Sequence, residues 1–151
     1  MMNKQYDNIL VPVDLAHASS WRKALPEAVA FALRHQSQLH LMTVVPDADI
    51  PAIAVHLPDN IDQKIRRKGQ EALEQLSQRE IPQDLSSRTV VAQGRVDKQI
   101  LRVAAEVGAD LIVMASHRPK TSDYLFSANA AYVTRHAACS VMVVREKQEE
   151  H

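Results

Sequence analysis

The hydrophobic positions of this chain form two patterns that take turns along the sequence: short continuous runs, and longer stripes with helical spacing. A short apolar run is typical of a buried strand, whereas apolar residues three or four positions apart are typical of a helix that packs on a sheet. The runs predict five strands, at Ile9–Val13, Leu39–Val45, Ser87–Ala92, Leu111–Ala115 and Val141–Val144. The stripes predict four helices, from about Ser20, over Ile61–Gln78, from Asp97 to about Val107, and up to about His136.

Strands that alternate with helices are typical of βαβ units. We therefore expect an α/β, Rossmann-like fold with a doubly wound, five-stranded parallel sheet and helices on both faces. The run Leu111–Ala115 is apolar throughout and should lie in the interior of that sheet. No internal repeat, low-complexity segment or linker divides the chain, so we expect a single domain over residues 1–151.

Some residues near the predicted element ends carry conformational signals. Ser19 or Ser20 is suited to cap the first helix, and Pro26 predicts a kink or a late start because proline has no amide hydrogen. Asp97 is suited to cap the third helix, and Gly108 is suited to its left-handed end. The second helix should bury five apolar residues, namely Ile61, Ile65, Ala72, Leu73 and Leu76.

Two features interrupt the regular pattern in the middle of the chain. Gly69 lies inside the second helix, where it costs about 1 kcal/mol relative to alanine. The stretch Pro46–Asn60 contains three prolines and has no clear period. Connections of that length are often lids or binding loops, and a plain crossover is an equally good interpretation.

Composition excludes several classes of function. The 18 Lys and Arg balance the 18 Asp and Glu, so no overall field attracts nucleic acid or an anionic membrane. The apolar runs are shorter than the roughly 20 residues of a membrane-spanning helix, and the first residues are too polar for a signal peptide. Cys139 is the only cysteine, so no intrachain disulfide can form, and we expect a reducing, cytoplasmic environment.

Candidate chemistry gathers where the predicted strands end. In an open parallel sheet, ligands bind beyond the carboxyl ends of the strands, at the point where the strand order reverses. Three segments converge there, Pro12–Asp14, Thr43–Pro46 and Ala115–Asn129. A nucleotide is the natural ligand for such a crevice. With only three glycines in the chain, however, neither the G-x-G-x-x-G fingerprint nor a P-loop can be written.

Three stretches carry a resemblance to a known family. Ile9–Asp14 reads ILVPVD, Ala115–Pro119 reads ASHRP, and Arg135–Arg145 reads RHAACSVMVVR. In these stretches the chain resembles the universal stress proteins, and within them the branch that has a Ser-His-Arg-Pro loop and a Ser-Asn-Ala turn. That branch includes homologues encoded beside uptake transporters. The resemblance implies a small α/β domain that binds ATP or AMP and forms a homodimer through its last strand, here Ser140–Arg145.

The nucleotide loop of that family is written G-x-x-G, about nine further residues, and then G-[ST]. Those positions fall on Ala115, Arg118, Ser127 and Ala128, so every glycine is replaced. Glycine lets a backbone approach phosphates closely, and here Arg118 and Lys120 would supply positive charge instead. Ser127 and Asn129 should lie at the start of the last helix, where free amides and the helix dipole favour an anion.

The resemblance also implies roles for individual residues. Asp14 would contact the nucleoside, although an Asp after a strand is also an ordinary turn residue, and the backbone of Val44 would pair with the adenine edge. Magnesium could accompany ATP, but the sequence shows no dedicated cage for it. The complete set of expected nucleotide-binding residues is Pro12, Val13, Asp14, Thr43, Val44, Met114, Ala115, Ser116, His117, Arg118, Lys120, Ser127, Ala128 and Asn129.

Catalysis and metal binding have weaker support. Ser116 and His117 resemble a nucleophile and a base, but the side chains of adjacent residues rarely point at each other. At most weak, incidental ATP hydrolysis is therefore expected. His136 and Cys139 have a spacing that metal ligands use, but a helix end followed by a packed cysteine explains them more simply.

We therefore expect a cytoplasmic, stress- or transport-linked regulator that binds ATP or AMP and has a regulatory protein partner. A nucleotide-free homodimeric interaction module is the alternative, and a weak nucleotide hydrolase is a third hypothesis.

Overall fold

The computed structural model describes residues 6–47, 60–116 and 124–145. It contains all five strands and all four helices expected from the sequence, with one additional 3-10 turn. In chain order the elements are β1 (Asn8–Val13), η1 (Ala18–Ser20), α1 (Ala24–His35), β2 (Gln38–Val45), α2 (Ile61–Glu80), β3 (Ser87–Gln93), α3 (Val96–Val107), β4 (Leu111–Ser116), α4 (Tyr124–His136) and β5 (Ser140–Arg145).

The five strands form one parallel sheet in the order β3-β2-β1-β4-β5. The chain winds outward from β1 to β3 in one direction, then returns and winds outward through β4 and β5 in the other. This is the expected doubly wound fold, and the strand order reverses between β1 and β4. The apolar strand β4 lies inside the sheet, as predicted, and β5 forms one edge.

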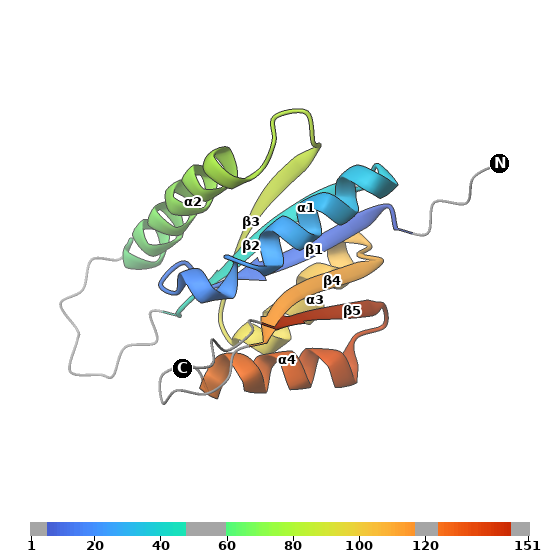
Figure 1. Ribbon diagram of the computed structural model, residues 1–151. Helices are drawn as coiled ribbons and strands as arrows, with labels where there is room; N and C mark the ends of the chain where they lie inside the picture. The colour runs from blue at the N-terminus through green and yellow to red at the C-terminus, as the bar shows by residue number, and fades with distance from the viewer. Residues whose placement is uncertain (1–5, 48–59, 117–123, 146–151) are drawn as a thin grey trace, which may run out of the picture.

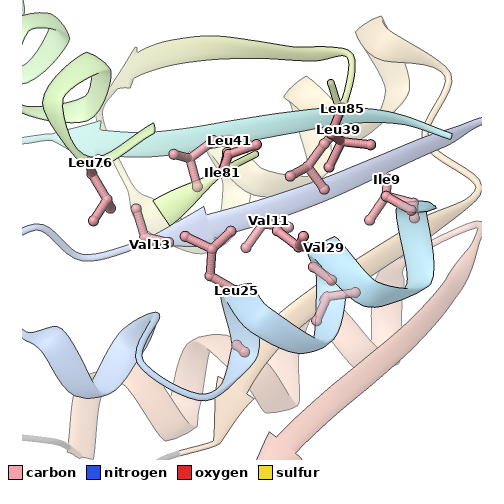
Figure 2. Packing of buried hydrophobic residues seen from close by; sticks show 14 of the residues in the cluster. Ile9, Val11, Val13, Leu25, Val29, Leu39, Leu41, Leu76, Ile81 and Leu85 are labelled. Atoms are coloured by element: carbon pink, nitrogen blue, oxygen red, sulfur yellow. The ribbon is translucent and has the colours of Figure 1, made fainter. Parts of the chain in front are cut away.

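Each face of the sheet is covered by two helices (Figure 1). Because successive side chains of a strand point to opposite faces, Ile9, Val11 and Val13 pack toward α1 and α2, as Figure 2 shows. Leu10 and Ile112 pack toward α3 and α4 on the opposite face. Burying a side chain such as Leu10, whose exposed fraction is 0%, contributes about 1.5 to 3 kcal/mol.

Gly69 sets how closely α2 approaches the sheet. A Cβ atom at this position would lie 2.8 Å from Cγ1 of Val45, so only glycine allows the observed contact without a shift. The packing that this approach permits offsets the poor helix propensity of glycine. The buried stripe of α2 is therefore Gly69, Leu73 and Leu76. Ala72 is exposed, contrary to the prediction, because it lies about 100° around the helix from Leu73.

Two predicted helix caps are wrong. Ser19 and Ser20 belong to η1, and α1 begins later, at Ala24. That late start was one of the two outcomes expected from Pro26, which is the third residue of α1 and needs no intrahelical amide bond there. Asp97 is the second residue of α3 instead of its cap. Gly108 does close α3, with φ of 65° and ψ of 43°.

Candidate functional site

The ladder between β1 and β4 ends early. The two strands pair only through Ile9 with Leu111 and Leu10 with Ile112, although β1 continues to Val13 and β4 to Ser116. Pro12 follows the last pair closely and has no amide hydrogen to donate to a ladder. The carboxyl ends of β1 and β4 are thus free of mutual backbone pairing at the position where doubly wound folds bind ligands.

Asp14 follows β1 directly and stands at this opening. Its Oδ1 accepts a hydrogen bond from the amide of Ala16 at 2.9 Å, and its Oδ2 lies 2.9 Å from Nδ1 of His17. An ionised carboxylate can only accept, so the proton of this second bond belongs to His17. The side chains of Asp14 and His17 remain 45% and 46% exposed, which leaves lone pairs of the carboxylate open to a ligand.

Ser20 closes the segment that carries Asp14. Its side chain is buried, and its Oγ accepts a hydrogen bond from the amide of Asp14 at 2.8 Å. The same hydroxyl is within donating distance of the carbonyls of Asp14, at 2.9 Å, and His17, at 2.7 Å. Ser20 therefore holds the Asp14 turn in place, which is a different role from the helix cap expected of it.

The contact of His17 with Asp14 was not predicted from the sequence. The available signal was the spacing Asp-x-x-His immediately after a strand that ends at the ligand-binding edge. At that spacing one turn of chain brings an imidazole nitrogen against the carboxylate, as the 2.9 Å contact shows.

The end of β2 lies next to the Asp14 turn. Thr43 is buried and donates from Oγ1 to the carbonyl of Val13 at 2.9 Å, so its hydroxyl ties β2 to β1. The carbonyl of Val45 accepts from the amide of Gly94, which follows β3. Because the backbone groups of consecutive strand residues point to opposite neighbours, the carbonyl of Val44 points toward β1. The β1–β2 ladder ends at the pair Val13 and Thr43, so this carbonyl lies past its last pair.

The expected residues of β1 and β4 lie at the carboxyl ends of these strands. Pro12, Val13, Met114 and Ala115 are all buried there. Ser116 is partly exposed and is paired in register with Arg145 of β5.

The start of α4 differs from the expectation. The helix begins at Tyr124, so the amides of Ala128 and Asn129 lie past its first turn and are not among the free amides of a helix start. Ala128 is exposed and Asn129 partly exposed, which keeps the Asn129 side chain available. Ser127 lies in the helical backbone, while His117, Arg118 and Lys120 fall outside the described residues.

The described ranges contain neither a metal-binding cluster nor a membrane-spanning helix. No group of three or more His, Cys, Asp or Glu side chains there could hold a metal ion. None of the helices in those ranges is long and apolar enough to cross a membrane. Cys139 is partly buried and packs against the α3 and α4 side of the core, and α4 ends at His136, in agreement with the simpler interpretation of both residues.

Comparison with known proteins gives a consistent picture. Residues 5–145 match the profile of the universal stress protein family. Universal stress protein G of Escherichia coli O157:H7 is 28% identical over 142 residues, which cover 93% of this chain and 99% of that protein. The solved structure of universal stress protein UspA from Lactobacillus plantarum has a TM-score of 0.68 and 28% identity, with 93% of this chain and 98% of that chain covered.

Two solved structures with a similar fold contain a bound nucleotide. One is a universal stress protein in complex with cAMP, with a TM-score of 0.60, 20% identity and 94% and 98% of the two chains covered. The other is a universal stress protein family protein from Arabidopsis thaliana with AMP bound, with a TM-score of 0.60, 14% identity and 95% and 94% covered. At these identities the likeness is one of fold.

Proposed function

The chain belongs to the universal stress protein family, and on that premise we propose that it binds an adenine nucleotide at the carboxyl edge between β1 and β4. The observation that carries this proposal is the early end of the β1–β4 ladder, with the half-exposed carboxylate of Asp14 beside it. The cAMP and AMP in the two similar structures support the same ligand class. In this proposal the protein is a cytoplasmic, stress- or transport-linked regulator, and the nucleotide tunes its contact with a protein partner.

Each part of the nucleotide has a proposed partner in the chain. The free lone pairs of Asp14 accept hydrogen bonds from ribose hydroxyl groups, while Ala16 and His17 fix the orientation of the carboxylate. The carbonyl of Val44 accepts from the exocyclic amino group of adenine. Arg118 and Lys120 supply charge for the phosphates, and Ser127 and Asn129 supply polar side chains. Magnesium would accompany ATP as a phosphate-bound ion.

Thermal unfolding in the presence of AMP, ADP and ATP tests the proposal. A ligand at 100 times its Kd stabilises the folded state by about 2.7 kcal/mol, which raises Tm by roughly 5 to 10 °C for a domain of this size. Asp14→Ala should bind at least about tenfold more weakly, because one charge-assisted hydrogen bond is worth that factor. Asp84→Ala, which removes an exposed carboxylate from the α2–β3 connection, is the matched control and should respond like the wild type.

One outcome would contradict nucleotide binding, and another would contradict the regulatory role. A flat Tm with all three nucleotides and magnesium would favour the nucleotide-free interaction module. Phosphate release from ATP well above background, and abolished in Asp14→Ala, would favour the hydrolase. We expect wild type and variant to release phosphate equally slowly, since the proposed role is regulatory.

We also propose that a homodimer forms through β5. This strand is an edge of the sheet, and its residues Val141–Val144 are all only partly buried. The amide of Ser140 donates toward β4, to the carbonyl of Asp110, so by alternation the backbone groups of Val141 and Val143 point away from the sheet. Unpaired outward amides on an apolar edge are suited to pair with a second copy.

Light scattering tests the dimer. The wild type should have twice the chain mass of 16.9 kDa. Val143→Pro removes one outward amide, which an edge strand tolerates, and should give a folded monomer. Val143→Ala keeps the amide and should remain a dimer. A monomeric wild type, or a dimer that survives Val143→Pro unchanged, would exclude pairing through this strand.

A further inference from the structure

A concave site lies at the opposite, amino edge of the sheet. It is a shallow cavity, wide open to solvent, with a volume of about 550 Å³. Three segments form it, each leading into a different strand. Tyr6 precedes β1, Ala109 and Asp110 precede β4, and Ala138 and Cys139 lead into β5 at Ser140. None of these residues belongs to the nucleotide site proposed above.

Asp110 is the charged group of this amino-edge cavity and is held rigidly. Its Oδ2 accepts hydrogen bonds from the amides of Asp7, at 2.8 Å, and Asn8, at 3.0 Å. Its own amide donates to the carbonyl of Asn8, and its carbonyl accepts from the amide of Ser140. Within the described part of the chain, Oδ1 has no hydrogen-bond partner. The cavity therefore contains a fixed carboxylate with one oxygen still able to accept.

The remaining polar groups of the cavity are neutral. Tyr6 is packed edge-on against Phe31 and His35, with ring centroids 5.0 Å and 5.6 Å apart, so its ring is a rigid wall. Burial raises the pKa of the Cys139 thiol above its ordinary value, and the charge of Asp110 adds to this effect, so the thiol is protonated near neutral pH. Ser140 adds an exposed hydroxyl. No lysine or arginine is among the described residues that line the cavity.

We propose that the amino-edge cavity binds a small organic cation that carries a primary ammonium or guanidinium group. Such a group donates to Oδ1 of Asp110 in a charge-assisted hydrogen bond. A neutral polyol would leave the charge of Asp110 uncompensated, and an anion would be repelled by it. This inference does not depend on nucleotide binding, because it concerns the other edge of the sheet.

Cys139 provides a reporter of occupancy, because it lines the cavity and is the only cysteine of the chain. The rate of alkylation by iodoacetamide at about pH 8.5, followed by intact mass, measures how accessible its thiol is. Agmatine, which carries both cationic groups, should slow alkylation about tenfold at ten times its Kd, since about one site in eleven then stays free. Glycerol, and sodium chloride at matched ionic strength, should leave the rate unchanged.

Asp110→Asn tests whether the charge is responsible. The asparagine carbonyl oxygen can still accept both amide hydrogens, so the fold should be kept, and a thermal melt checks this. The charge of Asp110 is one cause of the raised pKa of Cys139, so without that charge alkylation in the absence of ligand should become faster. Protection, taken as a ratio within each variant, should need at least about tenfold more agmatine, as loss of one charge-assisted hydrogen bond implies.

Asp84→Asn is the control and should behave like the wild type. The proposal would be overturned by the absence of protection at 10 mM agmatine, by equal protection from sodium chloride, or by full protection in a folded Asp110→Asn variant. If AMP did not stabilise the protein, protection of Cys139 by agmatine would be unaffected. The cation proposal and the nucleotide proposal can therefore be refuted independently.

Discussion

The two edges of the sheet are held in different ways. At the amino edge, side chains connect segments that are far apart in the chain: Asp110 binds the start of β1, and Ser37 donates to the carbonyl of Tyr6 at 2.6 Å. At the carboxyl edge, the polar contacts of Asp14 stay within the segment 14–20. The β1–β4 ladder also ends before this edge. The amino edge thus fixes β4 to β1 through Asp110, whereas at the carboxyl edge the contacts of Asp14 tie no second strand to β1, and Thr43 joins β2 to β1 instead.

The two edges should therefore differ in how much their side chains stabilise the fold. A hydrogen bond between distant segments is broken when the fold unfolds, so the amino edge contributes to the free energy of unfolding. A hydrogen bond within seven residues orients a side chain but ties no strand to another. Side chains such as Asp14 at the carboxyl edge can therefore change with little effect on the fold.

The largest expected effect comes from breaking the amino-edge contacts of Asp110. Asp110→Ala removes two hydrogen bonds to amides that join β1 to β4 and should lower the free energy of unfolding by about 2 kcal/mol. For a domain of this size Tm should fall by roughly 4 to 8 °C. Urea unfolding followed by circular dichroism measures the change.

Asp14→Ala is the matched variant at the carboxyl edge. It removes as many side-chain contacts, but these are local and half exposed, so the expected loss is about 0.5 kcal/mol or less. Equal destabilisation by the two substitutions would contradict the distinction between the edges.

Much of the fold was predictable because several independent signals agreed. The five apolar runs and the four stripes located every strand and helix, and Gly108 marked a helix end that needs a left-handed residue. The unbroken apolar run of β4 also indicated burial on both faces, and therefore an interior strand. These features follow from side-chain period and backbone sterics, which are properties of short segments.

The errors have a common physical origin. Ser20 looked like a cap because it is small and polar, but a buried contact with Asp14 decides its role. Ala72 looked buried because it is apolar, but the close approach at Gly69 turns a different stripe toward the sheet. Each depends on how segments fold back on one another, and spacing alone does not determine that.

The smallest expected effect is a loss of stability in acid that arises near the amino edge. His40 of β2 is buried, with its Nε2 3.0 Å from Oδ1 of Asn8. Burial, and to a lesser extent the charge of Arg88, hold the pKa of His40 below its ordinary value. The unfolded chain binds this proton at about pH 6.5, whereas the folded chain binds it only at lower pH.

The free energy of unfolding should therefore be insensitive to this residue above about pH 7, and it should decrease as pH falls from 6.5 toward the lower pKa of folded His40. His40→Gln removes the titration and keeps an amide that can donate to Asn8, so its unfolding free energy should fall less between pH 7 and pH 5. Urea titrations at the two pH values measure both proteins, and an equal acid loss in His40→Gln and wild type would show that the buried histidine is not its source.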